Sequence, residues 1–186
     1  LKKMMPTVPQ NQMVTLAMMV SGIVLSRKAQ LSVMSLEIPH PAKPASLEKR
    51  FHRFVKNERF DTQVCYLPFA HLILSHLADK PLILAMDGST VGRGCMTLMV
   101  GVIYRQRAIP LAWIVYKGKK GHTTAAHHIT VLKQLLPLLP EAAEVILLGD
   151  GEYDTVEMLT WVTNRTNWQY IVRTSKSNLI THDGQQ

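Results

Sequence analysis

Two continuous apolar runs, each ending in an aspartate and a glycine, constrain the fold of this chain most. The first is LILAMDGST, which contains Asp87, and the second is VILLGDGEYD, which contains Asp150. Such runs are typical of strands buried on both faces of a sheet. An ionised carboxylate is costly in a protein interior, so an aspartate where a buried strand ends indicates a functional role. Because parallel strands present their carboxyl ends together, we expect both aspartates at one end of a sheet.

The chain before Pro81 has a helical pattern. We expect helices over residues 13–28 and 31–37, a proline-broken connector in IPHPAKPAS, a third helix capped by Ser46, and an apolar helical link over residues 61–80. On the third helix the apolar residues fall on one side, and the basic residues Lys49, Arg50, Arg53 and Lys56 fall largely on the other.

From Pro81 onward the pattern changes to strands. We expect strands over residues 82–86, 96–104, 109–116, 145–149 and 169–174, and helices over residues 124–139 and 155–164. Strands that follow one another directly pair antiparallel, and strands separated by helices pair parallel. Pro110 cannot donate to a ladder, so its strand should be an edge strand. The sequence therefore predicts an α/β fold: a ribonuclease H-like mixed five-stranded sheet flanked by helices, preceded by a small all-helical region.

Other acidic residues have simpler interpretations. Asp154 and Glu157 fit a capping box for the helix that follows them. Glu152 lies in the loop beside Asp150 and could approach a metal ion there. For Asp87 and Asp150 themselves a turn remains an alternative, since Asp-Gly pairs are common in turns.

Two carboxylates at one end of a sheet predict a site for Mg²⁺ or Mn²⁺, which take oxygen ligands. In phosphoryl transfer two such ions, about 3.5–4 Å apart, clamp the attacking and leaving oxygens. A bridging aspartate and one further anchor leave one ion short of protein ligands. We therefore expect Asp87 and Asp150 to be catalytic and metal-binding, and a third acidic ligand to be needed.

The charge of the chain favours a polyanionic partner. The formal net charge is +8 and the isoelectric point is near 9.7, which favours nucleic acid over a membrane surface. The candidate phosphate-binding residues are Lys49, Arg50, Arg53 and Lys56 on the third helix, and Lys117, Lys119 and Lys120 in a glycine-containing loop. The alternatives are a solvated helix face and lysines that protect an exposed edge strand.

Several other kinds of site and segment are not expected. His122, His127 and His128 do not have the spacing that would place two imidazoles on one helical face. The apolar segment over residues 13–25 is shorter than the roughly 20 residues of a membrane span. Cys65 and Cys95 form no CxxC motif, which favours buried thiols in a reducing compartment. We expect a soluble, cytoplasmic protein without a membrane partner.

Three segments resemble DDE transposases of bacterial insertion sequences. They are LILAMDGST, the hairpin ending in IPLAWIVYKGKKGHT, and VILLGDGEYD followed by a helix and QYIVRTSKS. FHRFVKNERF resembles the DNA-binding region that precedes the catalytic domain in that family. The resemblance implies that Asp87 and Asp150 are the first two catalytic acids and that Arg173 faces DNA. It implies that the third acid, a glutamate on a late helix, lies beyond Gln186.

The resemblance also implies an organisation and an activity. Residues 1–62 would be a helical DNA-binding region, 63–80 a helical linker, and 81–186 a catalytic domain incomplete at its C-terminus. The activity would be metal-dependent endonuclease cleavage at insertion-sequence ends and strand transfer into target double-stranded DNA, in a monomer or a homodimer. Two alternatives remain open: a DNA-binding transposase remnant that cannot cut, and a ribonuclease H-like nuclease or resolvase.

Overall fold

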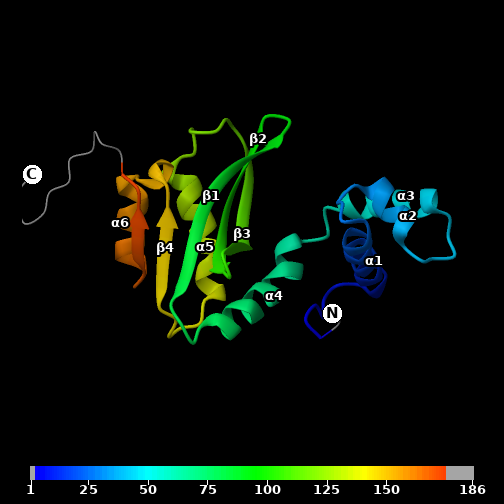
Figure 1. Ribbon diagram of the computed structural model, residues 1–186, viewed down its shortest axis with the longest axis horizontal. Coiled ribbons are helices and arrows are strands. Elements are labelled where there is room, and N and C mark those ends of the chain that lie inside the picture. Colours follow the sequence, from blue (N-terminus) through cyan, green and yellow to red (C-terminus); the bar gives the residue numbers. More distant parts are fainter. Residues whose placement is uncertain (1–2, 175–186) are drawn as a thin grey trace, which may run out of the picture. The chain divides into compact units, whose positions relative to one another are not determined.

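The computed structural model of the 186-residue chain describes residues 3–174. The chain divides into two compact units, Leu1–Phe69 and Ala70–Gln186. Figure 1 shows the elements, which are α1 (Gln10–Ser26), α2 (Leu31–Glu37), α3 (Pro44–Val55), α4 (Thr62–Leu77), β1 (Leu82–Gly92), β2 (Cys95–Tyr104), β3 (Arg107–Lys117), α5 (Ala125–Leu135), β4 (Val145–Gly149), α6 (Val156–Arg165) and β5 (Gln169–Val172). Within residues 3–174, no helix is both long enough and apolar enough to cross a membrane.

The first unit is helical, as expected. α1 and α2 approach closely at Gly22, where a β-carbon would come within 2.9 Å of the Met34 β-carbon. Met34 also packs with Leu47 and Phe51 of α3 in a buried cluster. The prediction that Ser46 caps α3 is wrong, because the helix begins two residues earlier at Pro44. Proline is well suited to the first helical position, where its missing N–H would have no partner within the helix.

The second unit is built on a five-stranded sheet with the order β3-β2-β1-β4-β5. β1 and β2 pair antiparallel, as do β2 and β3, whereas β1 and β4, and β4 and β5, pair parallel. This combination of order and direction confirms the predicted ribonuclease H-like mixed sheet flanked by helices. β3 lies at the edge, as expected from Pro110.

β1 is longer than predicted. The sequence indicated a strand ending at Met86, but β1 continues to Gly92 because β2 keeps pairing with it after β4 has stopped. Asp87 therefore lies inside the strand, opposite Met99 of β2. The antiparallel hairpin, rather than the apolar run, determines where β1 ends.

The prediction that β1 is buried on both faces is also wrong. Leu82, Leu84 and Met86 are buried, whereas Ile83, between them, is 38% exposed. The buried side of the sheet is covered by α5, which packs on β2 and β3 and contacts α6 (Figure 1). The alternation of buried and exposed residues continues to Asp87 and Ser89, which are both exposed.

The helices α5 and α6 start and end differently from the expectation. α5 gives way after Leu135 to a 3-10 helix, Leu136–Leu138, since Pro137 cannot continue the α-helical hydrogen bonds. The predicted capping box of Asp154 and Glu157 is wrong, because α6 begins at Val156. Asp154 instead accepts a hydrogen bond from the Thr174 hydroxyl.

Candidate metal and nucleic-acid site

Asp87 and Asp150 occupy equivalent positions on neighbouring parallel strands. The last pair of the ladder between β1 and β4 is Ala85 with Leu148, and each aspartate lies two residues further along its chain. Both are exposed. Asp87 is held in a strand by its pairing with β2, whereas Asp150 follows the last residue of β4. The two aspartates thus lie toward the end of the sheet where β4 and β5 finish, called the carboxyl end below.

One oxygen of each carboxylate is held by a nearby backbone N–H. Oδ1 of Asp87 accepts from the Gly88 amide at 2.9 Å, and Oδ1 of Asp150 accepts from the Glu152 amide, also at 2.9 Å. In the part of the chain that the structure describes, Oδ2 of neither residue accepts a hydrogen bond. Mg²⁺ is commonly held by one or two carboxylates together with substrate phosphates. The two Oδ2 atoms are the carboxylate oxygens that could ligate such an ion.

A fuller metal cage is not found among residues 3–174. No group of three or more histidine, cysteine, aspartate or glutamate side chains there could hold a metal ion. The third acidic ligand expected from the sequence is therefore not supplied by these residues. Its predicted place, beyond Gln186, lies outside the described residues.

Tyr153 packs against β1 next to Asp87 and against the end of β4. Its side chain is 1% exposed. A β-carbon on Gly88 would lie 3.3 Å from the Tyr153 hydroxyl oxygen, and one on Gly149 would lie 3.0 Å from the Tyr153 β-carbon. Gly88 follows Asp87 and Gly149 precedes Asp150. A single buried ring therefore fills the space next to both aspartates, and a β-carbon at either glycine would press against it.

The electrostatic surroundings of Tyr153 show how closely the acidic groups gather. Burial raises the pKa of its hydroxyl above the ordinary value of 10.0, and the negative charges of Glu152, Asp87 and Asp150 raise it further. Three carboxylates thus lie within electrostatic reach of one buried oxygen. Cations would reduce this concentration of negative charge.

His128 lies behind Tyr153 and is fully buried. The two rings meet edge to face with their centroids 5.0 Å apart. Within residues 3–174 neither ring nitrogen of His128 has a hydrogen-bond partner. Burial lowers the pKa of His128 below its ordinary value of 6.5, with the charge of Glu152 opposing this shift and that of His127 adding to it. Burial therefore favours the neutral form of His128.

Glu152 is held by a chain of hydroxyl groups. The Thr123 hydroxyl donates to Glu152 Oε1 at 2.5 Å, and the Tyr116 hydroxyl lies 2.7 Å from Thr123 Oγ1. Because Thr123 has one proton and gives it to Glu152, Tyr116 is the donor in the second bond. These two hydrogen bonds join the edge strand β3, the loop that follows it, and the turn after Asp150.

The predicted cations of the second unit lie at the same end of the sheet. Lys117 is the last residue of β3, and Lys119 and Lys120 follow in the loop; all three are exposed. Arg173 follows β5 and is also exposed, and its amide donates to the Gly149 carbonyl oxygen at 3.1 Å. The structure thus brings Lys117, Lys119, Lys120 and Arg173 to the end that holds Asp87 and Asp150.

The predicted cations of the first unit differ from one another. Lys49, Arg53 and Lys56 are exposed on α3. Arg50 is half-buried: its Nε donates to the Thr15 hydroxyl at 2.9 Å, and its Nη2 donates to the Asn11 carbonyl oxygen at 3.3 Å. Arg50 therefore joins α3 to α1, a role that the helical spacing alone did not reveal.

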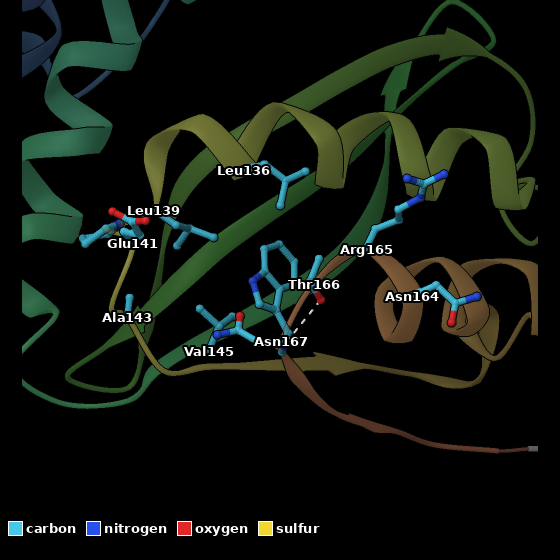
Figure 2. A pocket seen from close by; sticks show the side chains of 11 residues that line it. Leu136, Leu139, Glu141, Ala143, Val145, Asn164, Arg165, Thr166 and Asn167 are labelled. Atoms are coloured by element: carbon cyan, nitrogen blue, oxygen red, sulfur yellow. Dashed lines mark hydrogen bonds between the residues drawn. The ribbon is translucent and has the colours of Figure 1, made fainter.

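An open pocket in the second unit lies away from these groups. Figure 2 shows that it is lined by the 3-10 helix and loop before β4, with Leu136 and Val145, and by the end of α6, with Arg165. These segments lie at the amino ends of β4 and β5. The pocket therefore does not belong to the carboxylate site.

Sequence reasoning missed Tyr153, His128 and Thr123. A tyrosine three residues after Asp150 gives no sign that it folds back beneath two strands. His128 and Thr123 resemble ordinary helix and loop residues. Their roles depend on contacts between segments distant in the sequence.

Comparisons with known proteins found little. No protein-family model matches the chain, and no curated protein matches it. Among solved structures, it is similar to a chain of one described as "Crystal structure of the Mos1 Strand Transfer Complex", with 14% sequence identity and a TM-score of 0.32. The similarity covers 92% of this chain and 61% of that chain. The chain thus spans less than two thirds of that chain's length, and we draw no argument from a likeness of this degree.

Proposed function

We propose that this chain is part of a DDE-type transposase of the bacterial insertion-sequence class, which cleaves DNA at the ends of the element and joins them to target DNA. The observation that carries the proposal is the equivalent placement of Asp87 and Asp150 on neighbouring parallel strands. Exposed cations, which favour phosphate binding, lie toward the same end of the sheet. Arg173 lies next to Asp150, and Lys117, Lys119 and Lys120 lie beyond Asp87 at the end of β3.

In this proposal Asp87 and Asp150 hold Mg²⁺ or Mn²⁺ through their carboxylate oxygens. When bound, the ion supplies positive charge that stabilises a phosphoryl group under attack. The backbone amides of Gly88 and Glu152 orient the two carboxylates, and Tyr153 fixes the strand ends that carry them. In this proposal the third acidic ligand is a glutamate outside residues 3–174.

The remaining cations position double-stranded DNA. Arg173 contacts phosphates next to Asp150, and Lys117, Lys119 and Lys120 contact phosphates further along the duplex. Lys49, Arg53 and Lys56 contact a second stretch of the duplex, and Arg50 supports their helix. We retain the proposed division into a DNA-binding region (residues 1–62), a linker (63–80) and a catalytic region (81–186).

Cleavage directed by bound iron tests the metal assignment on this chain directly. Fe²⁺ replaces Mg²⁺, and with ascorbate and peroxide it produces hydroxyl radicals that cut the polypeptide backbone near the ion. We expect cuts beside Asp87 and Asp150, and we expect Asp87→Asn and Asp150→Asn to remove them. Asp79→Asn is the matched control, because Asp79 is exposed at the opposite end of β1. Cuts that persist in both site variants would disprove the metal assignment.

DNA binding separates the proposal from its alternative. A duplex carrying the ends of the element should bind more tightly than a four-way junction of the same length, and Asp87→Asn should retain this preference. A stronger preference for the junction would favour a resolvase instead.

A further inference from the structure

The turn between β1 and β2 lies beside the loop that follows β3. Arg93 and Gly94 form this turn. The next residue, Cys95, pairs with Lys117 across the β2–β3 ladder, and the Gly118 amide donates to the Gly94 carbonyl oxygen at 3.0 Å. Arg93, which the sequence analysis did not select, is therefore a close neighbour of the predicted lysines.

The loop that carries these lysines is fixed at both ends. Gly118 holds its start against the β1–β2 turn, and Thr123 holds its end against Glu152. Lys119 and Lys120 lie between the two attachments and are exposed. Side chains presented by a fixed loop lose less conformational freedom on binding than those of a free loop. The loop is thus organised in advance for a ligand.

The charges of this surface have no ionic partner in the part of the chain that the structure describes. Within residues 3–174, none of Arg93, Lys117, Lys119 and Lys120 forms an ion pair. These four exposed residues are called the basic rim below. By contrast, Arg105 in the turn between β2 and β3 lies over the Tyr104 ring at 5.3 Å. Neighbouring unpaired cations attract a polyanion, and the regularly spaced phosphates of a nucleic acid can contact several of them at once.

The exposed side of β1 connects the basic rim with the carboxylates. From Asp87 the exposed positions continue through Ser89 and Val91 to Arg93. Six residues of strand span at most about 20 Å, which corresponds to roughly six base pairs of duplex. A duplex lying along this strand could contact the rim and place a phosphate at Asp87.

We propose that the basic rim binds the phosphate backbone of duplex DNA that runs along β1 to Asp87, and that Thr123 and Glu152 are positioning residues that hold the lysine-bearing loop in place. The proposal rests on the proposed function, since it takes the carboxylates as the point at which the DNA is cut. It adds Arg93 to the binding surface and gives Glu152 a role other than metal binding.

Duplex binding measured over a range of salt concentrations tests the rim. Each phosphate contact changes the log–log salt slope by about 0.9 and contributes about eight-fold in affinity at 0.1 M salt. We expect Arg93→Gly to bind duplex DNA more weakly and with a shallower salt slope. Arg93→Lys should restore the slope. Arg105→Gly is the matched control, because both arginines occupy hairpin turns with positive φ, 53° and 47°, so glycine strains neither turn. Equal affinities for Arg93→Gly and Arg105→Gly would overturn the role of Arg93.

Thr123→Val tests the positioning role. The substitution keeps the shape of the side chain and removes the hydroxyl that donates to Glu152, while every cation remains. We expect weaker binding with an unchanged salt slope, because the same phosphates are contacted by a less ordered loop. Parent-like affinity in Thr123→Val would overturn the positioning role.

Cross-linking through Cys95 locates the DNA independently. Cys95 is partly exposed beside Arg93, whereas Cys65 is 7% exposed. Hydroxyl radicals from Fe²⁺ held at Asp87 and Asp150 should also cut bound DNA. A thiol tethered to a phosphate roughly six base pairs from that DNA cut should form a disulfide with Cys95. Cross-linking spread evenly along the duplex would overturn the proposed path.

These results separate the rim from the metal site. Binding that depends on Arg93 without cuts that depend on Asp87 would support the rim and reject the metal assignment. Cuts that depend on Asp87, together with duplex binding that does not depend on Arg93, would reject the rim and leave the metal assignment in place. Binding to anionic lipid vesicles that depends on Arg93, with duplex binding unaffected, would also overturn the rim as a DNA surface.

Discussion

The hydroxyl oxygen of Tyr153 lies where a β-carbon on Gly88 would come within 3.3 Å of it. Gly88 is the residue after Asp87, and Tyr153 is in the turn that follows Asp150. The contact thus joins the two segments that carry the aspartates, and it makes Gly88 more than a turn residue.

This contact predicts that Gly88→Ala and Tyr153→Phe are coupled. Gly88→Ala alone should destabilise the protein by about 1–3 kcal/mol, because overpacking in a buried site forces neighbouring atoms to move. In a Tyr153→Phe background the cost should be smaller by about 1 kcal/mol, since the atom nearest the new methyl group is gone. Urea unfolding of the two single variants and the double variant measures this coupling.

Gly149→Ala is the control for that cycle. Its β-carbon would meet Tyr153 at Cβ, 3.0 Å away, and at Cδ2, 3.2 Å away, and both atoms remain in phenylalanine. Tyr153→Phe should therefore not relieve Gly149→Ala. Equal relief at both glycines would show that Tyr153 acts on stability in some other way than through this contact.

His128 predicts a loss of stability in mild acid. Its pKa is lowered in the folded protein, first by burial, from an ordinary value of 6.5. Below pH 6.5 the unfolded chain binds a proton that the folded chain does not. The free energy of unfolding therefore decreases as the pH is lowered. The slope for this one group is at most about 1.4 kcal/mol per pH unit, down to the lowered pKa. Urea unfolding between pH 5 and 8 measures it.

His128→Phe should remove this contribution. The other seven histidines remain in the variant, so the difference in slope between the two proteins isolates His128. At pH 7.5 we expect the variant to be about as stable as the parent, because it removes two buried nitrogens without partners and keeps an aromatic ring. Identical slopes in the two proteins would contradict the interpretation of His128 as a buried neutral residue.

Arg50 and Arg53 should differ although both were predicted to bind DNA. Arg50→Ala should destabilise the protein by about 1 kcal/mol, because it removes the bonds to Thr15 and Asn11. Arg53→Ala should leave stability unchanged and lower duplex affinity by about eight-fold at 0.1 M salt. Thermal unfolding and fluorescence anisotropy measure the two effects.

Thr15→Val provides the control for Arg50. It keeps the arginine charge and removes the hydroxyl that accepts from Nε. It should destabilise the protein while leaving the salt slope of DNA binding unchanged. A parent-like stability for both Arg50→Ala and Thr15→Val would return Arg50 to the group of exposed cations.

The two thiols should react at very different rates. Cys65 is buried, and burial, followed by the charge of Asp61, raises its pKa, so little thiolate is present at pH 7. Cys95 is partly exposed. A disulfide reagent should modify one thiol quickly and the second only after unfolding, and Cys95→Ser should abolish the fast phase. Two fast phases would show that the cluster around Cys65 opens readily.

The sequence determined most of the second unit because its signals are local. The apolar run over residues 145–149 became β4 without change, and Pro110 marked the edge strand, since a residue without an N–H cannot donate to a ladder. The alternation of strands and helices determined which strands are parallel. That order also predicted that Asp87 and Asp150 would lie toward the same end of the sheet.

Only the tertiary structure decided which residues support those aspartates and where the strand and helices end. β1 extends beyond Asp87 because β2 pairs with it, and Asp154 does not cap α6 but accepts a hydrogen bond from Thr174. Tyr153 meets Gly88 only because the turn after β4 folds back beneath β1. Local propensity reaches a few residues along the chain, whereas these contacts join segments far apart in the sequence, so their partners exist only once the sheet has formed.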